Sequence, residues 1–150
     1  MYASMIGRVV RGRFAAMSRG DSTAVLSFFA EDARFFYGGR HELAGEYRSK
    51  AEIASWFARL WELFRIEFHV HDVVVAGSPW NIRLATRFTA RVATADGRCF
   101  VNHGMQYARI RWGKVREDHI YPDTQLVAEA LEHVTGRQPQ SPPAVTRQPT

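Results

Sequence analysis

The chain has 150 residues, of which 46% are hydrophobic and 13% aromatic, and its formal net charge is +5. This length predicts one globular domain with its own core, and no window approaches the roughly 18 consecutive apolar residues of a membrane-spanning helix. The basic residues form no Lys/Arg-rich run, the first residues form no secretory-type apolar segment, and the lone Cys99 excludes an internal disulfide. We therefore expect a cytoplasmic protein that binds neither nucleic acid nor membrane.

Helical patterns dominate the first part of the chain. Residues 4–18 place apolar side chains at helical spacing, and Asp21 is placed to cap a second helix. A short strand is predicted over residues 33–37. The segment from Ser49 to Glu52 is a capping box, because the serine can accept from the first free amides of a helix and the glutamate can reach back. Behind it, apolar side chains repeat at three- and four-residue steps and predict the clearest helix of the chain: Ile53, Trp56, Phe57, Leu60, Trp61 and Phe64.

From residue 65 onward the hydrophobic period is two, which is typical of strands. The pattern predicts four strands, over residues 65–76, 80–94, 98–112 and 114–121. Asp96-Gly97 is a strong hairpin signal between the second and the third. A terminal helix follows over residues 124–133, with Asp123 as its N-cap. This order of elements predicts an α+β domain with helices on one face of a curved antiparallel sheet.

The end of the chain has a different composition. The last fifteen residues, GRQPQSPPAVTRQPT, hold four of the six prolines and almost no large apolar groups. Such a segment cannot bury enough surface to offset the entropy lost on ordering. We therefore expect a domain over residues 1–135 and a disordered tail over residues 136–150.

Three segments carry a resemblance to a known family: FFAEDARFFY, AGEYRSKAEIASWFARL and DGRCFVNHGMQYARIRWGKVREDHIYPDTQ. Over about residues 5–133 the chain resembles the SnoaL-like branch of the nuclear-transport-factor-two superfamily, whose relatives include ketosteroid isomerases and limonene epoxide hydrolases. The resemblance implies a cone-shaped barrel, in which a curved antiparallel sheet wraps around a long helix, with two N-terminal helices and a deep, largely apolar pocket. It says little about chemistry, because this scaffold hosts isomerases, cyclases, hydrolases and catalytically silent binding proteins.

Two arguments disagree on which side chains of the strands face the pocket. Plain alternation in residues 80–94 directs Leu84 and Phe88 inward and the arginines to water. A gapless comparison with the epoxide hydrolases reverses this assignment, and we adopt the reversed one. It leaves Leu84, Phe88, Met105 and Tyr107 on an outer face that a second copy would cover, and so predicts a homodimer. The side chains that it turns inward are His69, His71, Val73, Arg87, Thr89, Asn102, Gln106, Asp118 and Ile120.

The resemblance also implies roles for these residues. Polyketide cyclases of this family use an aspartate of the last strand as general acid/base, and Asp118 is the candidate here. A carboxyl group in an apolar funnel has a raised pKa, which suits proton transfer near neutral pH. His71 would tune Asp118, while Arg87 and Tyr37 would stabilise negative charge on a substrate oxygen. The remaining candidates for substrate binding are Phe35, Trp56, His69, Thr89, Asn102, Gln106 and Ile120.

Plainer interpretations stay open for several of these residues. Asp118 lies between Glu117 and His119 and would then be a solvated charge, and Arg87 would be an exposed arginine of a strand. His69 and His71 share a strand face and could bind a metal with Asp118, but no third ligand sits at a known spacing. We therefore expect no metal and no cofactor.

The expected function is that of a cofactor-free cyclase or isomerase acting on a hydrophobic, carbonyl-bearing, polyketide-like metabolite. One alternative is a dimeric pocket protein that binds a small ligand without catalysis. The other is an epoxide-hydrolase-like enzyme with an altered carboxylate arrangement, because Thr89 and Ile120 occupy the positions of the two epoxide-hydrolase aspartates. The sequence contains no Ser or Cys nucleophile motif and no glycine-rich phosphate loop.

Overall fold

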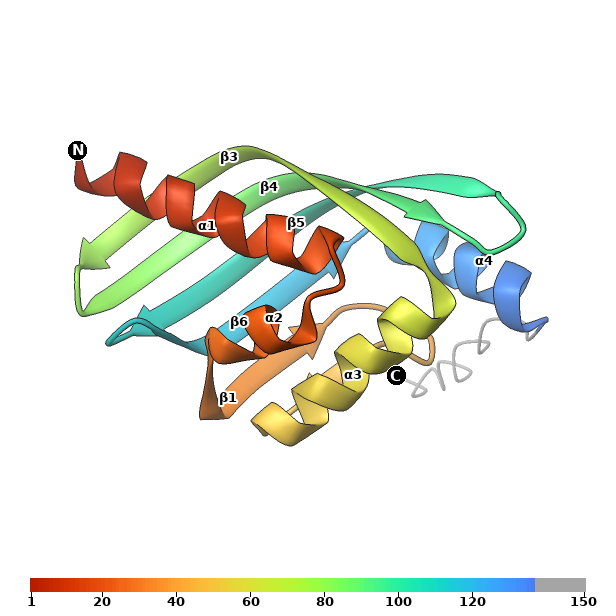
Figure 1. Ribbon diagram of the computed structural model, residues 1–150, viewed down its shortest axis with the longest axis horizontal. Coiled ribbons are helices and arrows are strands. Elements are labelled where there is room, and N and C mark those ends of the chain that lie inside the picture. Colours follow the sequence, from red (N-terminus) through yellow and green to blue (C-terminus); the bar gives the residue numbers. More distant parts are fainter. Residues whose placement is uncertain (137–150) are drawn as a thin grey trace, which may run out of the picture.

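The computed structural model describes residues 1–136. Within them lies one six-stranded sheet in the order β2-β1-β6-β5-β4-β3, accompanied by four helices (Figure 1). No helix in this range is long and apolar enough to cross a membrane. The predicted tail lies outside the described residues except for Gly136. The elements are α1 (Tyr2–Ser18), α2 (Ser22–Ser27), β1 (Phe29–Tyr37), β2 (Gly45–Tyr47), α3 (Lys50–Leu63), β3 (Arg65–Ser78), β4 (Asn81–Ala93), β5 (Cys99–Arg111), β6 (Lys114–Pro122) and α4 (Thr124–Thr135).

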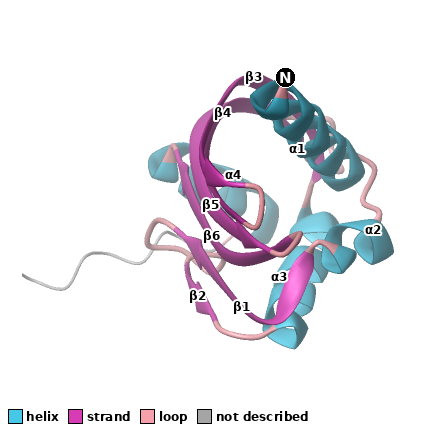
Figure 2. Cartoon of the chain, turned by 90° about the vertical axis from the view of Figure 1, so that its left-hand side faces the viewer, coloured by secondary structure: helices cyan, strands magenta, loops and turns pink. Residues whose placement is uncertain are grey.

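The sheet is curved and not closed, and β2 and β3 are its edge strands. Strands β3 to β6 form an antiparallel meander, whereas β1 pairs with β6 in parallel and with β2 antiparallel. Helix α1 contacts β3, and α3 contacts β1. Seen from one end, the sheet curves around the space that faces α1 and α3 (Figure 2). The predicted α+β cone is therefore confirmed.

Local signals in the sequence set where the helices begin. The side chain of Asp21 accepts from the amide of Ala24, and that of Asp123 accepts from the amide of Leu126, so both predicted N-caps are confirmed. Ser49 caps α3 by accepting from the Glu52 amide. The Glu52 carboxylate reaches back to the amide of Arg48, at 2.6 Å, which completes the capping box one residue further out than expected.

The structure overturns the reversed assignment of faces on β4. Leu84 and Phe88 are buried, whereas Arg87 is exposed. Directly opposite residues of an antiparallel pair share a face of the sheet. Phe88 pairs with Gly104 and Thr86 pairs with Gln106, so an inward Gln106 requires an inward Thr86 and an outward Arg87. Plain alternation was correct here, because apolar side chains gain from burial while an unpaired guanidinium loses its hydration.

Strand β3 shows why its faces were difficult to assign. A register shift lies between Val70 and Asp72 in the pairing with β4, and it leaves His71 as an extra residue. The bulge exchanges the faces of the strand, so Val70 and Val73 both pack against the core. Val73 therefore lies inside as expected, while His69 is exposed on the outer face and the expectation for it was wrong.

Candidate active site

The inner face of the sheet, together with α1, α3 and α4, lines a cavity of about 70 Å³. Its polar lining comes from Tyr37, Asn102, Gln106 and Asp118, and the rest of the lining is almost entirely apolar. A second cavity of about 40 Å³ is bordered by some of the same side chains, including Gln106 and Asp118. The aromatic walls of the larger cavity are Phe14, Phe35, Trp56, Phe57, Phe64, Phe68, Phe88 and Phe100.

Asp118 is the central polar group of this site. It lies on β6 between Phe35 of β1 and Ala108 of β5, and only 6% of its surface is exposed. Its Oδ1 accepts a hydrogen bond of 2.8 Å from Nε2 of Gln106. Burial raises the pKa of Asp118 to about 7, although the Gln106 hydrogen bond and the positive charge of Arg13 both act to lower it. Its carboxyl group is therefore divided between its acid and base forms near neutral pH, as general acid/base catalysis requires.

Arg13 of α1 is the cationic side chain of this site, and the sequence analysis did not assign it there. It borders the smaller cavity together with Asp118, and its guanidinium lies 4.7 Å from the centre of the Phe28 ring. Its Nε is buried and has no hydrogen-bond partner within residues 1–136. Burial lowers the pKa of Arg13, and the negative charge of Asp118 opposes that change. The sequence contains a signal for this position, because Arg13 lies three residues after Val10 and so on the same side of α1 as its apolar stripe.

The other predicted residues of the inner face fall into two groups. Tyr37 lines the cavity, and burial raises the pKa of its hydroxyl, which keeps it protonated as a hydrogen-bond donor. Phe35 and Ile120 are apolar wall residues. Asn102 also lines the cavity, but its side chain is engaged by the backbone of Asp123, donating to the carbonyl at 3.3 Å and accepting from the amide at 2.9 Å. Asn102 therefore joins β5 to the start of α4.

Four of the predicted site residues lie on the opposite face of the sheet from Asp118. Arg87 is 57% exposed and forms an ion pair of 2.6 Å with Asp72. His71 approaches Thr89 at 2.6 Å, and its ring lies 4.7 Å from that of His69. Desolvation lowers the pKa of His71, and the nearby Arg87 and His69 lower it further. The expectation that these side chains reach the cavity was wrong, because β4 keeps its plain alternation and β3 carries a bulge.

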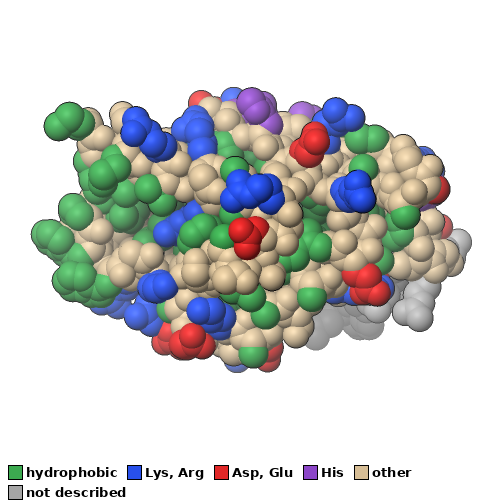
Figure 3. All heavy atoms as spheres, viewed as in Figure 1, with side chains coloured by type: hydrophobic (Ala, Val, Ile, Leu, Met, Phe, Trp, Pro, Cys, Tyr) green, Lys and Arg blue, Asp and Glu red, His purple; other side chains and the backbone are tan. Residues whose placement is uncertain are grey.

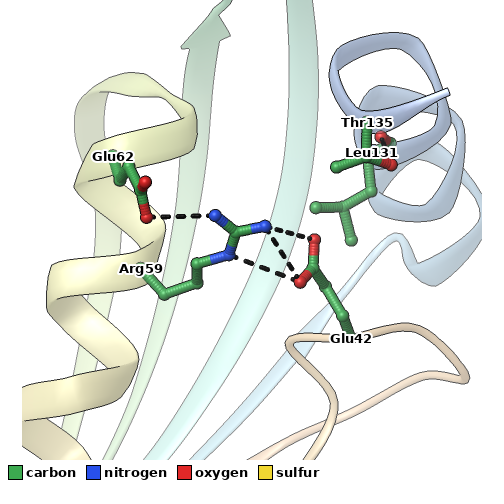
Figure 4. Close-up of polar contacts among 5 residues, drawn as sticks. All are labelled: Glu42, Arg59, Glu62, Leu131 and Thr135. Carbon is green, nitrogen blue, oxygen red and sulfur yellow. Dashed lines mark hydrogen bonds and ion pairs between the residues drawn. The ribbon is translucent and has the colours of Figure 1, made fainter. Parts of the chain in front are cut away.

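The loop between β1 and β2 closes one wall of the cavity and is tied to α3. Leu43 of this loop is 2% exposed and lines the cavity, and its carbonyl accepts from Nε1 of Trp56 at 2.9 Å. Arg59 of α3 grips both carboxylate oxygens of Glu42 and also contacts Glu62 (Figure 4). Trp56 therefore lines the cavity with its ring, while its indole N–H is already hydrogen-bonded to the Leu43 carbonyl. The loop and the helix form one unit beside the site.

Comparisons with known proteins agree with this architecture. The family model described as the SnoaL-like domain matches residues 10–118. A protein of unknown function from Burkholderia pseudomallei, described as NTF2-like, is similar in structure with a TM-score of 0.68 and 20% identity, covering 85% of this chain and 95% of its own. No curated protein sequence matches the chain.

Two further solved structures carry names that suggest chemistry. A protein from Xanthomonas campestris pv. campestris, provisionally named a polyketide cyclase, has a TM-score of 0.62 and 20% identity, covering 83% of this chain and 95% of its own. One from Novosphingobium aromaticivorans, provisionally named a scytalone dehydratase, has a TM-score of 0.69 and 13% identity, covering 81% and 83%. At these identities the likeness concerns the fold.

Proposed function

Since the chain belongs to the SnoaL-like domain family, we propose that it is a cofactor-free cyclase or isomerase that moves protons on a small, hydrophobic, carbonyl-bearing metabolite. The observation that carries this proposal is the buried Asp118, whose pKa is raised to about 7 and which opens onto a cavity with aromatic walls. A general base works best when its pKa lies near the working pH. Two structural neighbours provisionally named for a cyclase and a dehydratase support the same class of chemistry.

The residues of the cavity suggest a proton transfer next to a carbonyl. The carboxylate of Asp118 takes a proton from the carbon beside the carbonyl, and the electron pair of that C–H bond moves onto the carbonyl oxygen. The protonated hydroxyl of Tyr37 donates to this oxygen, and the charge of Arg13 stabilises it from the smaller cavity. In an isomerisation the proton returns to another carbon. In a ring closure the enolate carbon attacks a second carbonyl, and Asp118 gives its proton to the new alkoxide.

The volume of the site bears on the substrate. A cavity of about 70 Å³ is much smaller than the roughly 300–1,000 Å³ of pockets that hold drug-sized ligands. Phe14 and Met17 border both cavities, and methionine adapts readily because its side chain is unbranched. The proposal is therefore a substrate of about one ring, or a larger polyketide-like one whose entry displaces Met17 and joins the two cavities.

A small-ligand-binding protein without catalytic activity is the second candidate. The observation that favours it is the position of His71, which was expected to tune Asp118 and lies on the other face of the sheet. The epoxide-hydrolase-like alternative is not retained, because Arg87, the arginine that its arrangement needs, points away from the cavity.

The predicted homodimer is retained as a proposal with a smaller interface. Leu84 and Phe88 are buried inside the protomer, but the outer face still carries Met105 and Tyr107, exposed by 45% and 39%. The rings of His119 and Tyr121 stack beside them. We propose that a second copy covers this patch, as exposed apolar patches often imply. A cytoplasmic location is part of the same proposal, and cell fractionation would test it.

Hydrogen–deuterium exchange tests the proton transfer without knowledge of the true substrate. A simple aryl-substituted ketone such as phenylacetone is incubated with the protein in D₂O, and NMR follows the loss of the signal of its benzylic α-protons. We expect the wild type to accelerate exchange and Asp118→Asn to lose roughly 10²–10⁴-fold of that acceleration, the usual contribution of a general base. Arg87→Gln, on the outer face, is the matched control and should exchange like wild type. A wild type that binds the ketone but never accelerates exchange would favour the binding protein.

A further inference from the structure

A second, strongly charged groove lies on the outer side of the sheet. Its volume is about 440 Å³, which is within the range of small-molecule sites. It lies beside the turn between β5 and β6. Figure 3 shows the opposite, helix-covered side of the molecule, where hydrophobic side chains gather at the same end, the end of the β3–β4 and β5–β6 turns. The groove is lined by Asp32, Arg34, Arg109, Arg111, Trp112, Arg116 and Glu117.

Two irregularities of the backbone build this groove. The register between β5 and β6 shifts so that Arg109 pairs with Glu117 and Ile110 pairs with Val115. Arg116 is the extra residue of this bulge, and it reaches Asp32 of β1 at 2.6 Å. Bulges of this kind re-aim a side chain and are common next to functional sites. Here the bulge adds an arginine to the outer face of the sheet.

The second irregularity is the backbone of Trp112. Its φ is +49°, the single positive value of a non-glycine residue among residues 1–136, and Gly113 follows at +75°. A two-residue turn with both φ values positive suits Asn-Gly or Gly-Gly, and a bulky residue in this conformation is strained. The indole gains little burial in return, because Trp112 is 75% exposed. A strained residue that packs against little is a reason to look for a function.

The charges of the groove are not balanced. Four guanidinium groups and two carboxylates line it, which leaves an excess of two positive charges. Arg116 is paired with Asp32, and Nε of Arg109 donates to Asn81 at 3.2 Å. Arg34 and Arg111 form no ion pair and no side-chain hydrogen bond within the described part of the chain. Two free guanidinium forks beside an exposed indole fit a planar ring that carries a dianionic group.

We propose that this groove binds an aromatic phosphomonoester about the size of a mononucleotide, with its ring on Trp112 and its phosphate between Arg34 and Arg111. A phosphate monoester carries close to two negative charges at neutral pH and so matches the excess of the groove. Guanidinium forks bind phosphate oxygens in pairs, and a flat base stacks on an indole. The site is separate from the cavity at Asp118 and lies on the other side of the sheet.

Calorimetric titration with adenosine monophosphate, adenosine and inorganic phosphate tests the proposal on the full-length protein. We expect the nucleotide to bind at least about tenfold more tightly than either part alone, because stacking and charge pairing add. Trp112→Asn should weaken nucleotide binding by roughly 5- to 100-fold, the usual contribution of a stacked base. The same change should raise the thermal midpoint by about 2–4 °C, because Asn-Gly suits this turn. A purely structural tryptophan would lower it instead.

Arginine variants distinguish a specific nucleotide site from nonspecific electrostatic attraction to the basic surface. Arg111→Gln should weaken nucleotide binding by about tenfold, whereas Arg83→Gln should have little effect. Arg83 pairs opposite Arg109 in the sheet but does not line the groove, which makes it a matched control. Equal losses in both variants would overturn the proposal. It would also be overturned by nucleotide affinity no better than that of phosphate, or by an adenosine oligonucleotide that binds more tightly per nucleotide than the monophosphate does.

Discussion

Replacing Asp118 by asparagine should make the protein more stable at alkaline pH. The pKa of Asp118 is about 7 in the folded protein, against an ordinary value of 3.8. Between these values the folded protein binds more protons than the unfolded chain, so its free energy of unfolding falls as the pH rises through this window. A shift of about three pKa units at roughly 1.4 kcal/mol each corresponds to a loss of about 4 kcal/mol above pH 7. Asparagine has nearly the same shape and cannot ionise.

Urea unfolding of both proteins from pH 5 to pH 9 measures this effect. We expect the stability advantage of Asp118→Asn to be just under about 2 kcal/mol at pH 5, because that pH already lies about one pKa unit above the ordinary value of 3.8, and to grow toward about 4 kcal/mol at pH 8. Water that enters the cavity and hydrates the carboxylate would reduce both values. Titration of other groups cancels in the difference between the two proteins. Asp72→Asn, at a side chain that is 63% exposed, is the control and should show no such growth. Parallel curves for wild type and Asp118→Asn would refute the buried, proton-binding carboxyl group.

Three further changes test other parts of the structure. Arg13→Met should raise the pKa of Asp118, because it removes a positive charge that favours the carboxylate. An NMR titration of the carboxyl carbon shift would measure this pKa, and an unchanged value would show that Arg13 does not act on Asp118. Tyr107→Glu should convert the proposed dimer to a monomer in sedimentation experiments, and a wild type that is already monomeric at high micromolar concentration would remove the dimer. Gly104→Ala should destabilise the fold by roughly 1–3 kcal/mol in urea, because a Cβ would lie 2.5 Å from the Phe88 ring; an unchanged midpoint would mean that the ring moves aside.

The structural features that depend only on residues close together in the sequence were predicted correctly. The N-caps at Asp21, Ser49 and Asp123 and the hairpin at Asp96-Gly97 are local, and the structure confirms them. The three-residue strand β2 was missed, because so short an edge strand has almost no period. The first strand was found but was predicted too short, since its first residues belong to a pattern that also suits the end of a helix.

The faces of β3 and β4 depend on partners that are distant in the sequence, so the period alone could not decide them. The inward positions of Asn102, Gln106 and Asp118 were predicted correctly. Cross-strand pairing then excludes an inward Arg87, and that pairing could have been tested from the hairpin at Asp96-Gly97 alone. The scatter of the arginines along the sequence does not single out Arg13, whereas its position beside the apolar stripe of α1 does.

The bulge at His71 also changes what the open edge of the sheet offers to another molecule, because β3 is an edge strand. Strand β3 has fourteen residues and lies at an open edge of the sheet, where its unpaired backbone groups could accept a strand of another molecule. The bulge interrupts that edge near its middle and increases the local twist, so a straight incoming strand meets two short segments instead of one long one. At the opposite edge, β2 offers only three residues. Neither edge therefore offers a long continuous strand with which another molecule could pair.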